Sequence, residues 1–155
     1  MNNQHTFIYS TADEVITAAR SIMESMMVQR DVVLTSPDLV RQYLMTRLCR
    51  EEHEVFCVLF LDNQNRLISA ENMFRGTINA ASVYPREVVK AAIKHNAAAL
   101  ILSHNHPSGA AEPSTADRMI TQKLQGAMDL IDVRILDHIV VAGTDQVSFA
   151  ERGLL

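Results

Sequence analysis

Two histidines one residue apart, His104 and His106, follow the apolar run 97–102. In an extended segment, side chains two residues apart point to the same side, so both imidazoles can offer a ring nitrogen to a common point just beyond a strand. Eleven positions after His106, Asp117 supplies a carboxylate. Three such ligands, with a fourth tetrahedral position left for water, are typical of a catalytic zinc site rather than a closed structural one.

The segment between the histidines and the carboxylate is rich in residues that turn the chain. Pro107, Gly109 and Pro113 prevent regular structure. The sequence 114–117 (Ser-Thr-Ala-Asp) then indicates the start of a helix, with Asp117 in its first turn. A strand end and a helix start that face each other across this loop can surround one cation.

Each of these residues also has a purely structural interpretation. Ser114-x-x-Asp117 before an apolar periodic segment is a helix-capping pattern. A bare His-x-His pair also occurs in polar loops whose imidazoles only form hydrogen bonds to the backbone.

Hydrolysis at a zinc ion requires two further groups, a general base to activate the water and a hydrogen-bond donor for the oxyanion. Ser114 is close enough in sequence to Asp117 to be that donor, and capping does not exclude this role.

The complete pattern resembles a known signature. His104-x-His106, seven residues and Ser114-x-x-Asp117 is similar to the motif of the JAB1/MPN/Mov34 (JAMM) zinc metalloproteases. The form HNHPSG, with PSTAD after it and DHIVV further on, resembles the RadC family of bacterial JAMM-domain proteins. The likeness runs from about Glu54 to the C-terminus and includes LD at 61–62, GT at 76–77 and PRE at 85–87.

This resemblance implies a set of roles. One zinc per chain would be held by His104, His106 and Asp117, with Ser114 at the oxyanion. A glutamate on an early strand would be the acid/base, and Glu54, directly before the apolar run 55–61, matches that place. Its structural alternative is an ordinary charged residue at the end of a surface segment. The remaining candidates for the acid/base are Glu71, Glu87 and Glu112.

Length and composition favour one globular unit. The chain has 155 residues, 48% of them hydrophobic, with only 5 Gly and 4 Pro. We expect a small N-terminal helical extension, residues 1–32, followed by a JAMM/MPN domain over 33–155. The first ten residues lack a signal-peptide pattern and no apolar run reaches the length of a membrane span. The cytoplasm is therefore the expected compartment, with Cys49 and Cys57 as reduced thiols.

Hydrophobic periodicity predicts the elements. A capping box at 11–14 begins an amphipathic helix to Met27, whose methionine-rich face we expect to pack in the core. The other expected elements are a helix from Ser36-Pro37, a hairpin of strands 55–61 and 67–74, a helix from Pro85, a buried strand 97–103, a helix after 114, a strand 133–142 and a short strand 147–149. Their order predicts an α/β fold with three layers, α/β/α, around a mixed sheet. The resemblance implies the same JAB1/MPN-like, cytidine-deaminase-like architecture.

Two polar features in these elements carry further expectations. The charges Arg47, Arg50, Glu51 and Glu52 indicate a solvated surface rather than a docking patch. His138 interrupts an apolar strand. An imidazole there is more often satisfied by hydrogen bonds in the core than used as a ligand, although a place behind the metal ligands is the alternative.

Three functions are compatible with the sequence. The first is a zinc hydrolase of the metalloprotease kind that cleaves a peptide or isopeptide bond in a protein or peptide substrate. The second is a RadC-like DNA repair or processing factor. The net charge of −4 and the absence of Trp argue against nucleic acid as a partner, and the chain is too short to hold the family's N-terminal helical module before Glu54. The third is a non-catalytic metal-binding interaction domain. A zinc base deaminase is disfavoured because no Pro-Cys-x-x-Cys pair is present, and the sequence does not fix an oligomeric state.

Overall fold

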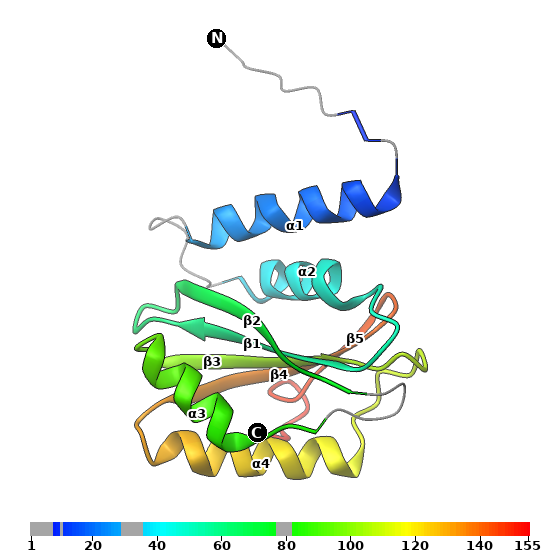
Figure 1. The fold of residues 1–155 in the computed structure, drawn as a ribbon. Coiled ribbons are helices and arrows are strands. Elements are labelled where there is room, and N and C mark those ends of the chain that lie inside the picture. Colours follow the sequence, from blue (N-terminus) through cyan, green and yellow to red (C-terminus); the bar gives the residue numbers. More distant parts are fainter. Residues whose placement is uncertain (1–7, 10, 29–35, 77–81) are drawn as a thin grey trace.

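The computed structural model describes residues 8–9, 11–28, 36–76 and 82–155. Its centre is a five-stranded sheet of order β2-β1-β3-β4-β5 (Figure 1). The strands are β1 (Val55–Leu61), β2 (Leu67–Arg75), β3 (Ala99–Asn105), β4 (Arg134–Ala142) and β5 (Asp145–Ser148). Strands β3 and β4 are parallel and the other neighbouring pairs are antiparallel. The predicted hairpin and the predicted mixed sheet are therefore both confirmed.

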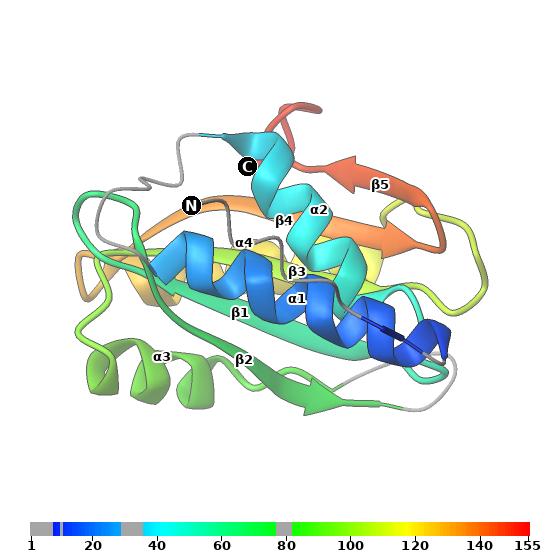
Figure 2. The ribbon, with the colours of Figure 1, turned by 90° about the horizontal axis from the view of Figure 1, so that it is seen from above.

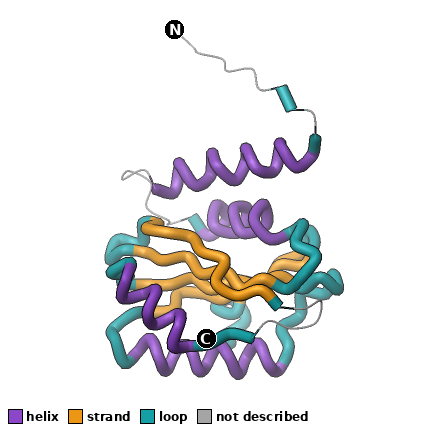
Figure 3. Tube along the Cα trace, in the orientation of Figure 1, coloured by secondary structure: helices purple, strands orange, loops and turns teal. Residues whose placement is uncertain are grey.

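Helices cover both faces of the sheet, which confirms the three-layer α/β/α prediction (Figures 1 and 3). Helices α1 (Ala12–Val28) and α2 (Pro37–Leu48) lie on one face, and α3 (Pro85–Lys94) and α4 (Thr115–Asp129) on the other. Among the described residues, no helix is both long and apolar enough to cross a membrane. The expected boundary between residues 32 and 33 lies outside the described residues, so the division into an extension and a domain stays a prediction.

Strand β1 forms the middle of the core. All seven of its residues are buried, and alternate side chains point to opposite faces of the sheet. Cys57 and Leu59 pack with residues of α2 such as Leu44, whereas Val58 and Phe60 pack with residues of α3 and α4. The unbroken apolar run follows from this double coverage, because neither face of β1 meets water.

The strand limits agree with the sequence-based prediction to within two residues, and two of the differences have a structural cause. Strand β3 extends to Asn105, so His104 lies within the strand and not beyond it. The extension follows from the parallel neighbour β4, since His104 pairs with Val140, Asn105 pairs with Val141 and the His106 amide donates to the Val141 carbonyl at 2.8 Å. Strand β5 begins at residue 145 rather than 147, because a tight turn lets Asp145 pair directly with Ala142.

Among the described residues, other elements cover only one side of helix α1. The predicted capping box is present, with the Thr11 amide and the Glu14 carboxylate at 3.2 Å. Met27 is fully buried in the core, but Val15, Ile22 and Met26 are 47%, 48% and 44% exposed. The prediction that the methionine-rich face packs in the core is therefore right for Met23 and Met27 and wrong for Met26. The reason is that α1 lies outside α2 and over the edge strand β2 (Figure 2).

Arg47 was expected on a solvated surface, and that expectation is also wrong. Its side chain is only 12% exposed and its guanidinium donates to Asn72 Oδ1 at 2.7 Å and to the Ala70 carbonyl at 3.1 Å. It also donates to the Tyr43 hydroxyl at 2.7 Å and to Glu24 Oε1 at 3.2 Å. One planar cation thus joins α1, α2 and β2, which the pattern of charges along the sequence does not reveal.

Replacement of Arg47 by lysine tests this joint. We expect Arg47→Lys to lower the free energy of unfolding by about 1–3 kcal/mol, because an ammonium cannot satisfy the same four acceptors from one position. Urea denaturation measures the change. The control is Arg50→Lys, since Arg50 is exposed and forms a surface ion pair with Asp13, and its effect should stay within about 0.5 kcal/mol. Equal losses in the two variants would contradict the assignment.

Candidate metal centre

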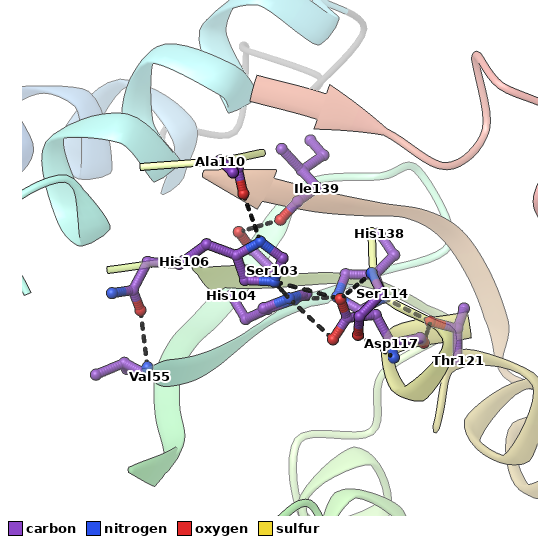
Figure 4. Close-up of polar contacts among 11 residues, drawn as sticks. Val55, Ser103, His104, His106, Ala110, Ser114, Asp117, Thr121, His138 and Ile139 are labelled. Carbon is purple, nitrogen blue, oxygen red and sulfur yellow. Dashed lines mark hydrogen bonds and ion pairs between the residues drawn. The ribbon is translucent and has the colours of Figure 1, made fainter. Parts of the chain in front are cut away.

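The candidate ligands lie where β3 ends and α4 begins (Figure 4). His104 is the penultimate residue of β3, His106 follows the strand, and Asp117 is the third residue of α4. Gly109 has a φ of +84°, a left-handed conformation that suits glycine, and its amide donates to the His106 carbonyl at 3.1 Å. This turn reverses the chain so that the first turn of α4 faces the end of the strand.

The three side chains converge on one point. The Nε2 atoms of His104 and His106 are 2.9 Å apart, and each lies 3.2 Å from an oxygen of the Asp117 carboxylate. Donor atoms bound to one tetrahedral zinc, at bond lengths of about 2.0–2.1 Å, lie about 3.3 Å from one another. The residues present therefore fit a small cation, and the triad could hold a metal ion.

The charges in this cluster are strongly coupled. Burial alone would raise the pKa of Asp117, but hydrogen bonds and charge from His104 and His106 hold it well below its usual range. The pKa of His106 is raised, first by its hydrogen bond to Asp117 and against the opposing effect of burial. Asp117 is thus a carboxylate at any pH near neutrality, which is the form that binds a cation.

Ser114 and Asp117 form the capping box that their spacing predicts. The Asp117 amide donates to Ser114 Oγ at 3.1 Å, and the Ser114 amide donates to Asp117 Oδ2 at 2.7 Å. The structural interpretation of this pair is therefore right, and it coexists with a carboxylate that faces both histidines. The cap fixes the Asp117 side chain in one orientation, because its oxygen is tied to the helix start.

The tautomer of His106 is fixed by its own loop. Its Nδ1 lies 2.7 Å from the Ala110 carbonyl oxygen, which can only accept, so the ring proton is on Nδ1. In the neutral ring Nε2 then carries the lone pair that a metal ion would use, whereas in the protonated ring Nε2 donates to Asp117 at 3.2 Å. This arrangement is typical of metal-binding histidines, whose second nitrogen donates to a carbonyl or carboxylate.

Asn105, between the two histidines, anchors the segment that carries Glu54. It is only 3% exposed, and its Oδ1 accepts the Val55 amide at 2.7 Å. Its amide nitrogen donates to the carbonyls of His53, at 2.9 Å, and Glu51, at 3.2 Å. Sequence reasoning missed this residue, although a carboxamide at the end of a buried strand must find partners and is a usable signal.

Glu54 is the candidate glutamate with an electrostatic link to the triad. Its carbonyl accepts the Gly76 amide at 2.8 Å, so the backbone is held from both sides, and its charge contributes to the raised pKa of His106. The other three candidates pair elsewhere: Glu71 with His95 at 2.5 Å, Glu87 with Lys90 at 3.1 Å and Glu112 with Arg152 at 2.5 Å. Glu54 thus raises the pKa of a candidate ligand, whereas the other three glutamates have ion-pair partners outside the triad.

His138 lies directly behind His104 and is not one of the converging ligands. It is fully buried, stacked on Phe149 with ring centroids 4.6 Å apart, and burial lowers its pKa well below the usual value. Its Nε2 lies 2.8 Å from His104 Nδ1 and its Nδ1 lies 2.6 Å from Thr121 Oγ1. The expectation of a hydrogen-bonded core histidine is confirmed, whereas Thr121 was not singled out from the sequence.

Comparison with known proteins agrees with this geometry. Residues 34–154 match the model of the RadC-like JAB domain. The chain belongs to the RadC-like JAB domain family. It is 61% identical over 127 residues to a UPF0758 protein of Pseudoalteromonas translucida, covering 82% of this chain and 57% of that protein. A UPF0758 protein of Leptothrix cholodnii is 58% identical over 146 residues, covering 94% of this chain and 65% of the relative.

These relatives are longer proteins than the chain itself. The RadC-like JAB match includes the triad, Ser114 and Glu54. The chain spans only about 57–65% of the length of the two relatives, so activities of a whole relative do not pass directly to this chain. The names of the relatives state no activity, and the chemistry of the site is therefore the basis for a function.

Removal of the Asn105 side chain tests the anchor of the Glu54 segment. We expect Asn105→Ala to lower the free energy of unfolding by about 1–3 kcal/mol, because the Val55 amide and two carbonyls lose their partner. Amide hydrogen exchange should become faster in residues 51–55. The matched control is Asn63→Ala in the exposed turn after β1, with a change of at most about 0.5 kcal/mol. Unchanged exchange in residues 51–55 would argue against the anchor.

Proposed function

We propose that the chain is a zinc-dependent hydrolase of the JAMM metalloprotease type that cleaves a peptide or isopeptide bond. The observation that carries the proposal is the convergence of His104, His106 and Asp117, with donor atoms 2.9–3.2 Å apart. The electrostatic effect of Glu54 on His106 supports it, because a hydrolytic site needs a base beside the ligands.

The ligand set favours zinc. Two imidazoles and one carboxylate suit zinc better than magnesium or calcium, which prefer oxygen ligands only. When bound, zinc lowers the pKa of a coordinated water to about 7 and polarises a substrate carbonyl. Three protein ligands leave a place for water and substrate, as in catalytic rather than structural sites.

Glu54 is proposed as the general base and acid. It accepts the proton of the attacking water and returns that proton to the leaving amine. Asn105 bonds to the backbone on either side of Glu54 and the Gly76 amide bonds to the Glu54 carbonyl, which supports a carboxylate that is positioned before substrate arrives. Such preorganisation avoids a reorganisation cost during the reaction.

Ser114 is proposed as the donor to the oxyanion. Its Oγ accepts the Asp117 amide, and that bond uses a lone pair and leaves the hydroxyl proton for an acceptor. The hydroxyl also helps to hold down the pKa of Asp117. It would therefore turn from Asp117 towards the substrate oxygen as negative charge develops there.

We propose a protein or peptide as the substrate and the cytoplasm as the setting. The chain carries 18 acidic and 14 basic residues, and this balance does not favour a nucleic acid held by bulk electrostatics. The free cysteines Cys49 and Cys57 suit a reducing compartment.

Metal analysis and substitution test this function. Elemental analysis of purified protein should give about one zinc per chain, and His104→Ala should abolish it. Glu54→Gln should retain the metal but lower turnover of a peptide and isopeptide library by about 10²–10⁴-fold. Ser114→Ala should lower turnover by about 10²–10³-fold.

The control is Glu87→Gln, because Glu87 pairs with Lys90 on the surface of α3. It should keep both metal and turnover. Full turnover by Glu54→Gln, or wild-type protein that neither contains nor binds zinc, would refute the proposed function. Salt-dependent binding to duplex or branched DNA that survives Glu54→Gln would favour a nucleic-acid role instead.

A further inference from the structure

Thr121 determines which nitrogen of His138 carries the proton. Thr121 Oγ1 lies 2.6 Å from the backbone carbonyl oxygen of Asp117, one helical turn earlier. Two oxygens this close need a proton between them, and a carbonyl cannot supply it, so the hydroxyl donates. A hydroxyl has a single proton. The contact of 2.6 Å between Thr121 Oγ1 and His138 Nδ1 must therefore have the imidazole as donor.

The position of that proton in turn sets the tautomer of His104. His138 is fully buried between the rings of Phe149 and Phe56, an environment that favours a neutral imidazole with one proton. With that proton on Nδ1, Nε2 of His138 is an acceptor. His104 Nδ1, at 2.8 Å, must then be the donor, so the lone pair of neutral His104 is on Nε2. That atom faces His106 and Asp117 (Figure 4).

We propose that His138 is a positioning residue which, held by Thr121, fixes His104 in the tautomer that presents the Nε2 lone pair to the metal. This inference deepens the proposed function, because it concerns the same site. The chain of hydrogen bonds begins at the Asp117 carbonyl, which accepts from Thr121, and ends at His104, whose Nε2 faces the Asp117 carboxylate. The start of α4 thereby orients two of the three candidate ligands. It orients Asp117 directly, and it orients His104 through Thr121 and His138 of β4.

The two histidines thus obtain the same tautomer by different means. His106 donates to a carbonyl of its own loop. His104 lies in a strand whose backbone groups are occupied by pairing with β1 and β4, and its side chain uses His138 instead. Partners of this kind behind a metal ligand typically change metal affinity by about 10–100-fold when removed.

Nitrogen-15 NMR of the imidazole side chains in metal-free protein reads the tautomers directly. Above pH about 8, where ordinary imidazoles are neutral, wild-type His104 should carry its proton on Nδ1. Thr121→Val keeps the shape but removes the hydroxyl, and His104 should then show both tautomers. Thr121→Ser restores the hydroxyl and should restore the single tautomer. Nδ1 protonation of His104 that is unchanged in Thr121→Val would overturn the proposal.

Zinc affinity gives the second readout. His138→Leu should weaken zinc binding, measured by chelator competition, by about 10–100-fold. His138→Gln keeps an acceptor near the position of Nε2 and should recover part of that loss. Wild-type affinity in His138→Leu, or equal losses in the two variants, would also overturn the proposal. If His138→Leu does not fold, the comparison of Thr121→Val with Thr121→Ser still tests whether His138 fixes the tautomer of His104.

These outcomes separate the role of His138 from the proposed function. The tautomer of His104 in metal-free protein does not depend on zinc, so wild-type protein that binds no zinc would refute the hydrolase but leave the NMR result meaningful. Conversely, zinc-dependent turnover together with an unchanged tautomer in Thr121→Val would preserve the hydrolase and reject the role of His138.

Discussion

Three consecutive polar side chains are buried at the end of β3, and the need to satisfy them organises this part of the molecule. Ser103, His104 and Asn105 are at most 3% exposed, in a strand with neighbours on both sides. A buried polar group without a partner costs about 1–3 kcal/mol. Ser103 and His104 therefore bond to β4, through the Ile139 carbonyl and His138, and Asn105 bonds to Val55 at the start of β1.

The same constraint explains why the site is compact. Among the described residues, every buried side-chain nitrogen and oxygen has a partner, and the charge of Asp117 is opposed by two imidazoles and a helix start. Asp117 caps α4 and faces the histidines at once. The start of α4 therefore also determines where this ligand lies, since a helix that began elsewhere would remove the carboxylate from the cluster.

The sequence was sufficient for the fold class, the hairpin and the convergence of the triad, because these depend on apolar periodicity and on two histidines at strand spacing. The sequence was insufficient where the end of a strand or the burial of a side chain depends on residues far away along the chain. The end of β3 depends on pairing with β4, and the burial of Arg47 depends on β2 and α1. Thr121 lacked a local signal strong enough to separate it from ordinary polar residues. The signal at Asn105 depends on where β3 ends, and Glu54 and Ser114 remain proposals.

The partners of Asn105 and His138 bear on any attempt to transplant this centre into another scaffold. The short motif from His104 to Asp117 contains every candidate ligand, yet it contains neither the segment that Asn105 anchors nor His138 behind His104. A working graft would need the chain entering β1, the last residues of β3, the first turns of α4 with Thr121, and the middle of β4. The smallest unit that could be transplanted is thus these four segments together, rather than the fourteen consecutive residues 104–117.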